Sequence, residues 1–129
     1  MYKKYFSLWV PVLIWCSVIF FFSSIPNLKT EFGFWDLILR KAAHITEYAI
    51  LFLLLRRAVA RTYPDLKDIS VYFISGIFSI LYAFSDEFHQ YFVVTRGPSL
   101  ADVMIDSIGG LIGLAAYLYW KKVSLGNNK

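Results

Sequence analysis

Charged residues are scarce in this 129-residue chain, which has 13 lysines and arginines, nine aspartates and glutamates, and a net charge of +4. With 17% charged residues, it has neither the charge density of a disordered segment nor the basic patches of a nucleic-acid-binding protein. We therefore exclude both classes and expect no nucleic-acid partner. The modest positive charge is better explained by membrane topology.

Only one cysteine is present, Cys16, and it lies inside an apolar run. A single thiol cannot form a disulfide within the chain and is a poor basis for a thiolate metal cluster. The chain also lacks an internal repeat, a low-complexity segment and any composition change that would mark a second domain. We therefore expect a single domain over residues 1–129.

Apolar surface dominates instead, with 58% hydrophobic residues, 19% aromatic residues and a mean hydropathy of +0.55. A soluble domain of this length has too little interior to bury so much of it. Four stretches suit the hydrocarbon core, which a helix of roughly 20 apolar residues crosses. They are about residues 5–25, 41–55, 69–91 and 100–120. The prediction is an all-α integral membrane bundle of four transmembrane helices.

Two of these stretches need comment. The first begins with Lys3 and Lys4 like a signal peptide, but its apolar run is long and residues 22–25 form a poor cleavage site, so we expect a retained helix. The second is the least hydrophobic because His44 and Glu47 interrupt it. The connection at 26–40 contains Phe32, Phe34, Trp35, Leu37 and Ile38 and could form a short amphipathic piece in the outer interface.

The basic residues divide unevenly between the two sides of such a bundle. Nine fall on the side of the termini, namely Lys3, Lys4, Arg56, Arg57, Arg61, Lys67, Lys121, Lys122 and Lys129. Four fall on the other side, namely Lys29, Arg40, Lys41 and Arg96. The positive-inside rule then places both termini in the cytoplasm. Most acids, Glu31 and Asp36 among them, fall on the outer side or in the outer part of the stretches.

Polar residues gather at the outward end of three of the four stretches. Charged groups in hydrocarbon are costly, so intramembrane acids are usually functional. The candidate site comprises Lys41, His44, Glu47, Tyr48, Asp86, Glu87, His89, Gln90, Arg96, Asp102 and Asp106.

Helical spacing places Lys41, His44 and Glu47 with Tyr48 along one face of the second helix. Glu47 lies roughly 9 Å deeper than Lys41 and needs a partner or a proton there. It either joins a functional site or forms a hydrogen bond that packs two helices together.

In the third stretch, Asp86, His89 and Gln90 share a face, and Glu87 points about 100° away from Asp86. Asp86 and His89 could form a carboxylate–imidazole pair suited to acid–base chemistry. The alternative for Glu87 and Gln90 is a helix end that dips into interfacial water.

Asp102 opens the fourth stretch with the capping-box spacing from Ser99, so it is either a cap or a site residue. Asp106 lies one turn deeper and cannot cap. The glycines that follow it, Gly109, Gly110 and Gly113, let another helix approach closely. We expect this face to pack into the bundle and to bring Asp106 towards Glu47 or His44. Arg96 is either their counter-charge or an ordinary interfacial arginine.

Two histidines and several carboxylates are residue types that bind zinc or a di-metal centre. However, the chain has no His-Glu-x-x-His motif, and His44 with Glu47 matches only His-x-x-Glu. The serines near the outer end, Ser23, Ser24, Ser85 and Ser99, lack a nucleophile-elbow motif. We therefore predict no metal and no cofactor, and the catalytic residues, if any, stay unassigned.

These residues together resemble the VanZ-like family over nearly the whole chain. The resemblance rests on Phe-Ser-Ser-Ile-Pro at 22–26, Lys-Ala-Ala-His-Ile-Thr-Glu-Tyr at 41–48, Ser-Asp-Glu-Phe-His-Gln-Tyr-Phe at 85–92, and Arg96 followed by Asp102, Asp106 and the glycines. Ile25 replaces a glutamine-like residue, and Val94-Thr95 replaces Pro-Gly. The resemblance implies a bacterial cytoplasmic-membrane protein linked to low-level resistance to teicoplanin, a lipoglycopeptide. It implies no cofactor or reaction.

Three functions remain open on this basis. The polar pocket, with Arg96 and Lys41 meeting anionic groups, could bind an outer-leaflet amphiphile such as a lipid-linked cell-wall precursor or the antibiotic itself. It could instead be an intramembrane acid–base enzyme that acts on a lipid-linked substrate. It could also be structural, locking the helices together or docking a membrane partner. A proton-coupled transporter fits less well, since no acids continue through the cytoplasmic half. The oligomeric state is not predicted.

Overall fold

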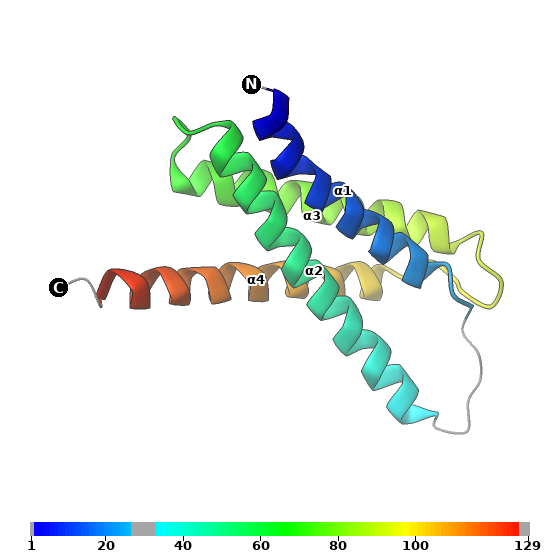
Figure 1. The fold of residues 1–129 in the computed structure, drawn as a ribbon. Helices are drawn as coiled ribbons and strands as arrows, with labels where there is room; N and C mark the ends of the chain where they lie inside the picture. Colours follow the sequence, from blue (N-terminus) through cyan, green and yellow to red (C-terminus); the bar gives the residue numbers. More distant parts are fainter. Residues whose placement is uncertain (1, 27–32, 127–129) are drawn as a thin grey trace.

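The chain folds into four α-helices, shown in Figure 1. The computed structural model describes residues 2–26 and 33–126, so Lys29, Glu31 and Lys129 of the charge count lie outside it. The helices are α1 (Tyr2–Ser23), α2 (Phe34–Thr62), α3 (Asp68–Gln90) and α4 (Leu100–Gly126), and the described residues contain no strand. The all-α prediction is confirmed.

Helix α2 is much longer than the stretch predicted at 41–55. Residues 34–40 form its first two turns instead of a separate interfacial piece, while residues 27–32 lie outside the described part. The helix starts after Gly33, whose φ of 40° favours glycine, and ends shortly before Pro64. His44 and Glu47 lowered the hydropathy, but backbone hydrogen bonds hold a helix whatever its side-chain polarity. The 29 residues span about 44 Å.

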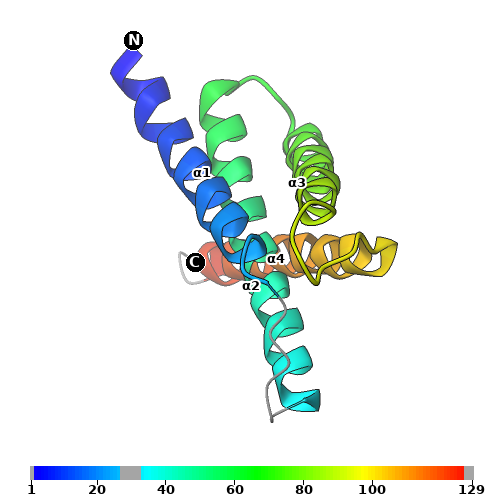
Figure 2. The same ribbon diagram turned by 90° about the vertical axis from the view of Figure 1, so that its right-hand side faces the viewer.

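Helix α2 is also the central helix of the bundle. It contacts α1, α3 and α4, whereas α1 and α4 do not contact each other within the described residues. Figures 1 and 2 show its C-terminal half beside α1 and α3, and α4 crossing it near the middle. Tyr48, Leu51, Leu55 and Ala58 of α2 are buried in the core. The other helices therefore enclose the core-facing part of α2, whereas Phe34, Trp35 and Leu39 near its start are exposed.

The other three helices carry the membrane-facing surface. Among the described helices, α1, α3 and α4 are long and apolar enough to cross a membrane by length and composition. Large hydrophobic side chains cover their outer faces, as shown by Leu13, Phe73 and Leu111, which are each about two-thirds exposed. In water this surface would be costly, and in lipid it is the expected one.

Two glycines set the closest approach of α4 to α2. A Cβ atom on Gly109 would lie 2.5 Å from the Ile45 carbonyl oxygen, and one on Gly113 would lie 2.6 Å from that of Ala49. Gly110 faces α3 instead, where a Cβ would lie 3.6 Å from Ser79 Oγ. Helix α4 thus packs on α2 through its glycine face, and this crossing fixes the position of the residues one turn earlier.

Two side-chain contacts hold together the end of the bundle where the chain begins and finishes. The Trp9 indole N–H donates to Thr62 Oγ1 at 3.1 Å, which places the start of α1 beside the end of α2. Lys121 Nζ lies 2.5 Å from Asp68 Oδ2, which places the end of α4 beside the start of α3. The polar residues of the candidate site belong to the other ends of these helices.

Candidate polar site where α2, α3 and α4 meet

The centre of the site is an imidazole–carboxylate contact between α2 and α4. His44 Nδ1 lies 3.2 Å from Asp106 Oδ1, and the Asp106 side chain is completely buried. Asp106 precedes Gly109 by one turn, and His44 is next to Ile45, so the glycine crossing brings the two together. The sequence argument that the glycine face would carry Asp106 towards Glu47 or His44 agrees with this contact.

Helix α3 adds a second buried carboxylate. Asp86 is 2% exposed, and its Oδ2 accepts hydrogen bonds from Ser23 Oγ at 2.7 Å and from Gln90 Nε2 at 3.0 Å. Ser23 is the last residue of α1, so all four helices contribute to the site. Ser23 is therefore a hydrogen-bond donor to Asp86, whereas its position in the sequence suggests only a nucleophile near the site. The sequence did point to Ser23 in one way, because residues 22–26 carry part of the family resemblance.

His44, Asp86 and Asp106 form a compact three-residue cluster. Each offers one ligand-type atom, and these three atoms all lie within 4.8 Å of one another. The second oxygen of each carboxylate, Asp86 Oδ1 and Asp106 Oδ2, is buried without a hydrogen-bond partner among the described residues. Buried polar atoms are normally paired, so the cluster has acceptor capacity that the described protein atoms do not use.

His89 does not pair with Asp86 as its three-residue spacing suggested. Its Nε2 lies 2.9 Å from Ser24 Oγ, and its ring stacks on Phe20 with centroids 4.0 Å apart. The contacts come from Phe20 of α1 and from Ser24, which directly follows that helix, so the spacing within α3 gives no indication of them. The imidazole–carboxylate pair of this site joins two helices, so no spacing within one helix could have indicated it.

Glu87 and Gln90 are buried, which contradicts the idea that this helix end dips into interfacial water. Glu87 Oε2 accepts the Ser99 backbone N–H at 2.7 Å, and its Oε1 is buried without a hydrogen-bond partner among the described residues. In a capping box that N–H would go to Asp102, which is half-buried here. Glu87 therefore anchors the start of α4 to the end of α3.

The remaining candidates surround the cluster. Lys41, Glu47 and Arg96 are half-buried, and the Glu47 backbone carbonyl accepts the Trp15 indole N–H at 2.9 Å. Burial lowers the pKa of the Arg96 guanidinium below its usual value, and Arg40 lowers it further, while Asp86 acts in the opposite direction. No ion pair between Arg96 and an acid is found in the described part of the chain.

Tyr48 lies fully buried one turn after His44. Its hydroxyl oxygen has no hydrogen-bond partner among the described residues, and its ring centroid lies 6.4 Å from that of Tyr82. The tyrosine fills the interior at the crossing of α2 and α4, where the Tyr48 Cβ would be 3.0 Å from a Cβ on Gly109.

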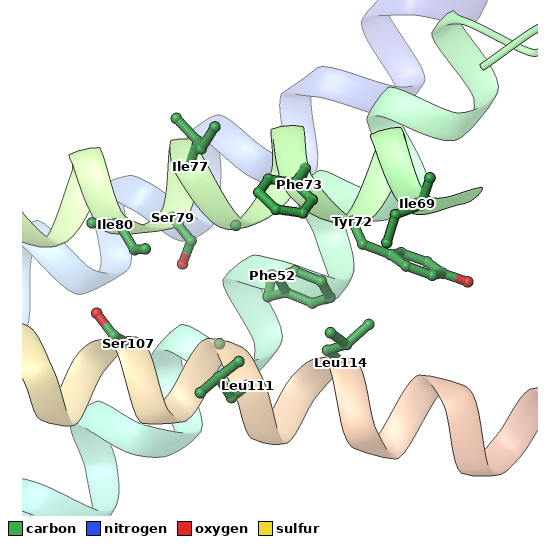
Figure 3. A pocket seen from close by; sticks show the side chains of 12 residues that line it. Phe52, Ile69, Tyr72, Phe73, Ile77, Ser79, Ile80, Ser107, Leu111 and Leu114 are labelled. Atoms are coloured by element: carbon green, nitrogen blue, oxygen red, sulfur yellow. The ribbon is translucent and has the colours of Figure 1, made fainter. Parts of the chain in front are cut away.

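An apolar cavity of about 360 Å³ opens between α2, α3 and α4 next to the cluster (Figure 3). Phe52, Phe73, Leu111 and Leu114 form much of its wall, and the Ser79 and Ser107 hydroxyls are among its few polar groups. None of the three cluster residues lines the cavity, but Ser107 and Gly110 follow Asp106 within about one turn of α4. The cavity therefore begins about one turn from the polar cluster along α4. We call this cavity the α3–α4 groove.

Comparison with known proteins agrees with the resemblance inferred from the motifs. Searches of curated proteins and of solved structures each returned no match. The VanZ/LLP1 family model matches residues 8–121, a range that includes every residue of the cluster and of its surroundings. The chain therefore belongs to the VanZ/LLP1 family.

Proposed function

We propose that the protein binds an amphiphile in the outer leaflet of the bacterial cytoplasmic membrane. Its polar head would meet the His44–Asp86–Asp106 cluster and Arg96, and its chain would occupy the α3–α4 groove. A lipid-linked cell-wall precursor and a lipoglycopeptide such as teicoplanin both have this chemistry. Low-level teicoplanin resistance would follow from such binding, as expected from the family.

The topology we propose is four membrane passes with both termini in the cytoplasm. Helix α2 spans about 44 Å, more than the roughly 30 Å hydrocarbon thickness, and the other helices screen its polar residues. The shared end of the bundle carries the Trp9–Thr62 and Lys121–Asp68 contacts and most of the basic residues. Its excess of positive charge supports a cytoplasmic position.

One observation carries the binding proposal, namely that an apolar groove begins about one turn from a buried polar cluster within a membrane protein. Ser107 and Gly110 line the groove and follow Asp106 by one and four residues. A molecule with an anionic head and a long apolar chain needs a polar surface for its head and an apolar groove for its chain, close to each other. A site that only held the helices together would need no cavity beside it.

The test fills the groove without touching the cluster. Gly76 lines the groove, and a Cβ there meets nothing within 4 Å, so Gly76→Phe places a ring in the cavity without a backbone clash. Leu81→Phe, on an exposed face of the same helix, is the matched control. Teicoplanin and vancomycin susceptibility would be compared in a Gram-positive host at equal membrane abundance.

We expect the wild type and Leu81→Phe to protect selectively against teicoplanin, and Gly76→Phe and Asp106→Asn to lose that protection. Equal protection by all four proteins would refute the binding site. Loss of protection only because the variants disappear from the membrane would support the purely structural role.

A second candidate function is acid–base catalysis on a lipid-linked substrate. It is favoured by the buried His44–Asp106 contact, because a carboxylate that orients an imidazole is a common acid–base arrangement. Asp106→Asn separates the two functions. A catalyst would lose turnover but still retain lipid detected by native mass spectrometry, whereas a binding protein would show no turnover in the wild type.

A further inference from the structure

The His44–Asp86–Asp106 cluster has the composition and compactness of a metal site. One imidazole and two carboxylates come from three different helices, and their ligand-type atoms lie within 4.8 Å of one another. Around a zinc ion with bonds of about 2.1 Å, neighbouring tetrahedral ligands are roughly 3.4 Å apart. The 3.2 Å between His44 Nδ1 and Asp106 Oδ1 already has this size.

The two carboxylates also lack partners for half of their oxygens. Asp86 is 2% exposed and Asp106 is 0% exposed, yet Asp86 Oδ1 and Asp106 Oδ2 have no hydrogen-bond partner among the described residues. Burying two carboxylates beside a single imidazole is costly unless another positive charge compensates them. A divalent cation would supply this charge and ligate the oxygens at once.

A supporting hydrogen-bond network is present as well. The Asp86 Oδ2 atom accepts from Ser23 and Gln90, which fixes the orientation of the carboxylate. Metal-binding carboxylates usually have such outer partners. Surface acid clusters lack them, and they also lack this degree of burial.

We propose that His44, Asp86 and Asp106 bind one divalent transition-metal ion of the zinc class. Calcium is disfavoured because it needs six to eight oxygen ligands, and magnesium because it prefers oxygens and retained waters to an imidazole. Three protein ligands leave one tetrahedral position open, as in catalytic zinc sites. The sequence contains no metal motif because each ligand comes from a different helix.

The open position gives the metal a role in the proposed function. A phosphate or carboxylate head group would enter it while the chain lies in the α3–α4 groove. This role rests on amphiphile binding, whereas metal binding itself does not. The two are therefore tested separately.

Metal binding is measured on the full-length protein in detergent without added lipid. After treatment with a chelator, the protein is titrated with Zn²⁺ and its metal content is determined by elemental analysis. Co²⁺ serves as the spectroscopic probe, since a tetrahedral site gives intense visible absorption. The variants are His44→Gln, Asp86→Asn, Asp106→Asn and Ser23→Ala, with Asp68→Asn at the opposite end of α3 as control.

We expect about one zinc per chain and tetrahedral Co²⁺ absorption in the wild type and in Asp68→Asn. Ser23→Ala should weaken zinc binding about 10–100-fold, because it removes an outer partner of a ligand. The three ligand variants should weaken it more than Ser23→Ala does. Metal binding by a wild-type protein that gives no protection against teicoplanin would uphold the metal site and refute the proposed function.

A gain-of-signal variant covers the case in which ligand removal unfolds the protein. Asp106→Cys exchanges one ligand for a thiolate and should add a sulfur-to-cobalt charge-transfer band that the wild type, with Cys16 unchanged, does not show. Absence of that band, absence of stoichiometric zinc in the wild type, or unchanged affinity in the ligand variants would each overturn the metal site.

Discussion

Replacing Gly109 with alanine should disrupt the crossing of α2 and α4 on which the polar cluster depends. The new Cβ would lie 2.5 Å from the Ile45 carbonyl oxygen and 3.0 Å from Tyr48 Cβ. An ordinary contact is about 3.5 Å, so the two backbones must separate by roughly 1 Å. Neither neighbour is the flexible end of a side chain, so the strain cannot be relieved by a rotamer change.

The cost of such overpacking is typically about 1–3 kcal/mol. Alanine also gains about 1 kcal/mol over glycine in helix propensity, which would mask part of the loss. Gly76→Ala and Gly110→Ala correct for this gain, since a Cβ at Gly76 meets nothing within 4 Å and one at Gly110 lies 3.6 Å from Ser79 Oγ. Relative to these two controls, Gly109→Ala should be about 1–3 kcal/mol less stable.

The assay is reversible unfolding of the detergent-solubilised proteins, followed by circular dichroism at equal detergent concentration. The same separation of the helices should lengthen the 3.2 Å contact between His44 and Asp106 beyond hydrogen-bond distance. Gly109→Ala should therefore lose zinc binding, and Gly110→Ala, whose new methyl group faces Ser79, should keep it. If all three alanine variants unfold at the same free energy, the glycine crossing does not position the site.

Three further substitutions test individual contacts. Tyr48→Phe removes a buried hydroxyl without a partner, so the free energy of unfolding should stay the same or rise, and a loss above 1 kcal/mol would reveal a partner for that hydroxyl. Glu87→Ala leaves the Ser99 N–H unpaired and should cost about 1–3 kcal/mol, with faster amide exchange at the start of α4; unchanged exchange would contradict the anchoring role. Asp68→Asn breaks an exposed ion pair with Lys121 and should leave the unfolding midpoint unchanged, whereas a clear decrease would show that this pair holds α3 to α4.

The helix boundaries show how much of the secondary structure can be predicted from local sequence. Residues 69–91 were predicted for the third helix and α3 is Asp68–Gln90, because its apolar run is bounded by polar residues at both ends. The second helix was underestimated because the prediction followed hydropathy, and residues 34–40 and 56–62 are helical without being uniformly apolar. Hydropathy reports which residues suit lipid, and helix formation depends on backbone hydrogen bonding and on breakers such as Gly33 and Pro64.

The sequence indicates the polar candidates without their pairing, and their role as a site stays a prediction. Asp106 and His44 were expected to approach because the glycines of α4 indicated a packed face. His89 was assigned to Asp86 from spacing alone, whereas it contacts Phe20 of α1 and Ser24, the residue that follows this helix. Burial of Glu87 and Gln90 was missed for a related reason, since it depends on how the loop before α4 folds over the end of α3.

The sequence by itself determined the membrane-type composition, the four helices, and the concentration of polar residues at one end. These are local properties, because apolar runs and helical hydrogen bonds involve residues close together in the chain. Only the tertiary structure decided which polar side chains meet. His44 and Asp106 are 62 residues apart and Ser23 and Asp86 are 63 apart. The first contact depends on the crossing of α4 over α2 at Gly109 and Gly113, where the two backbones approach too closely for any side chain between them. The second depends on the packing of α1 against α3.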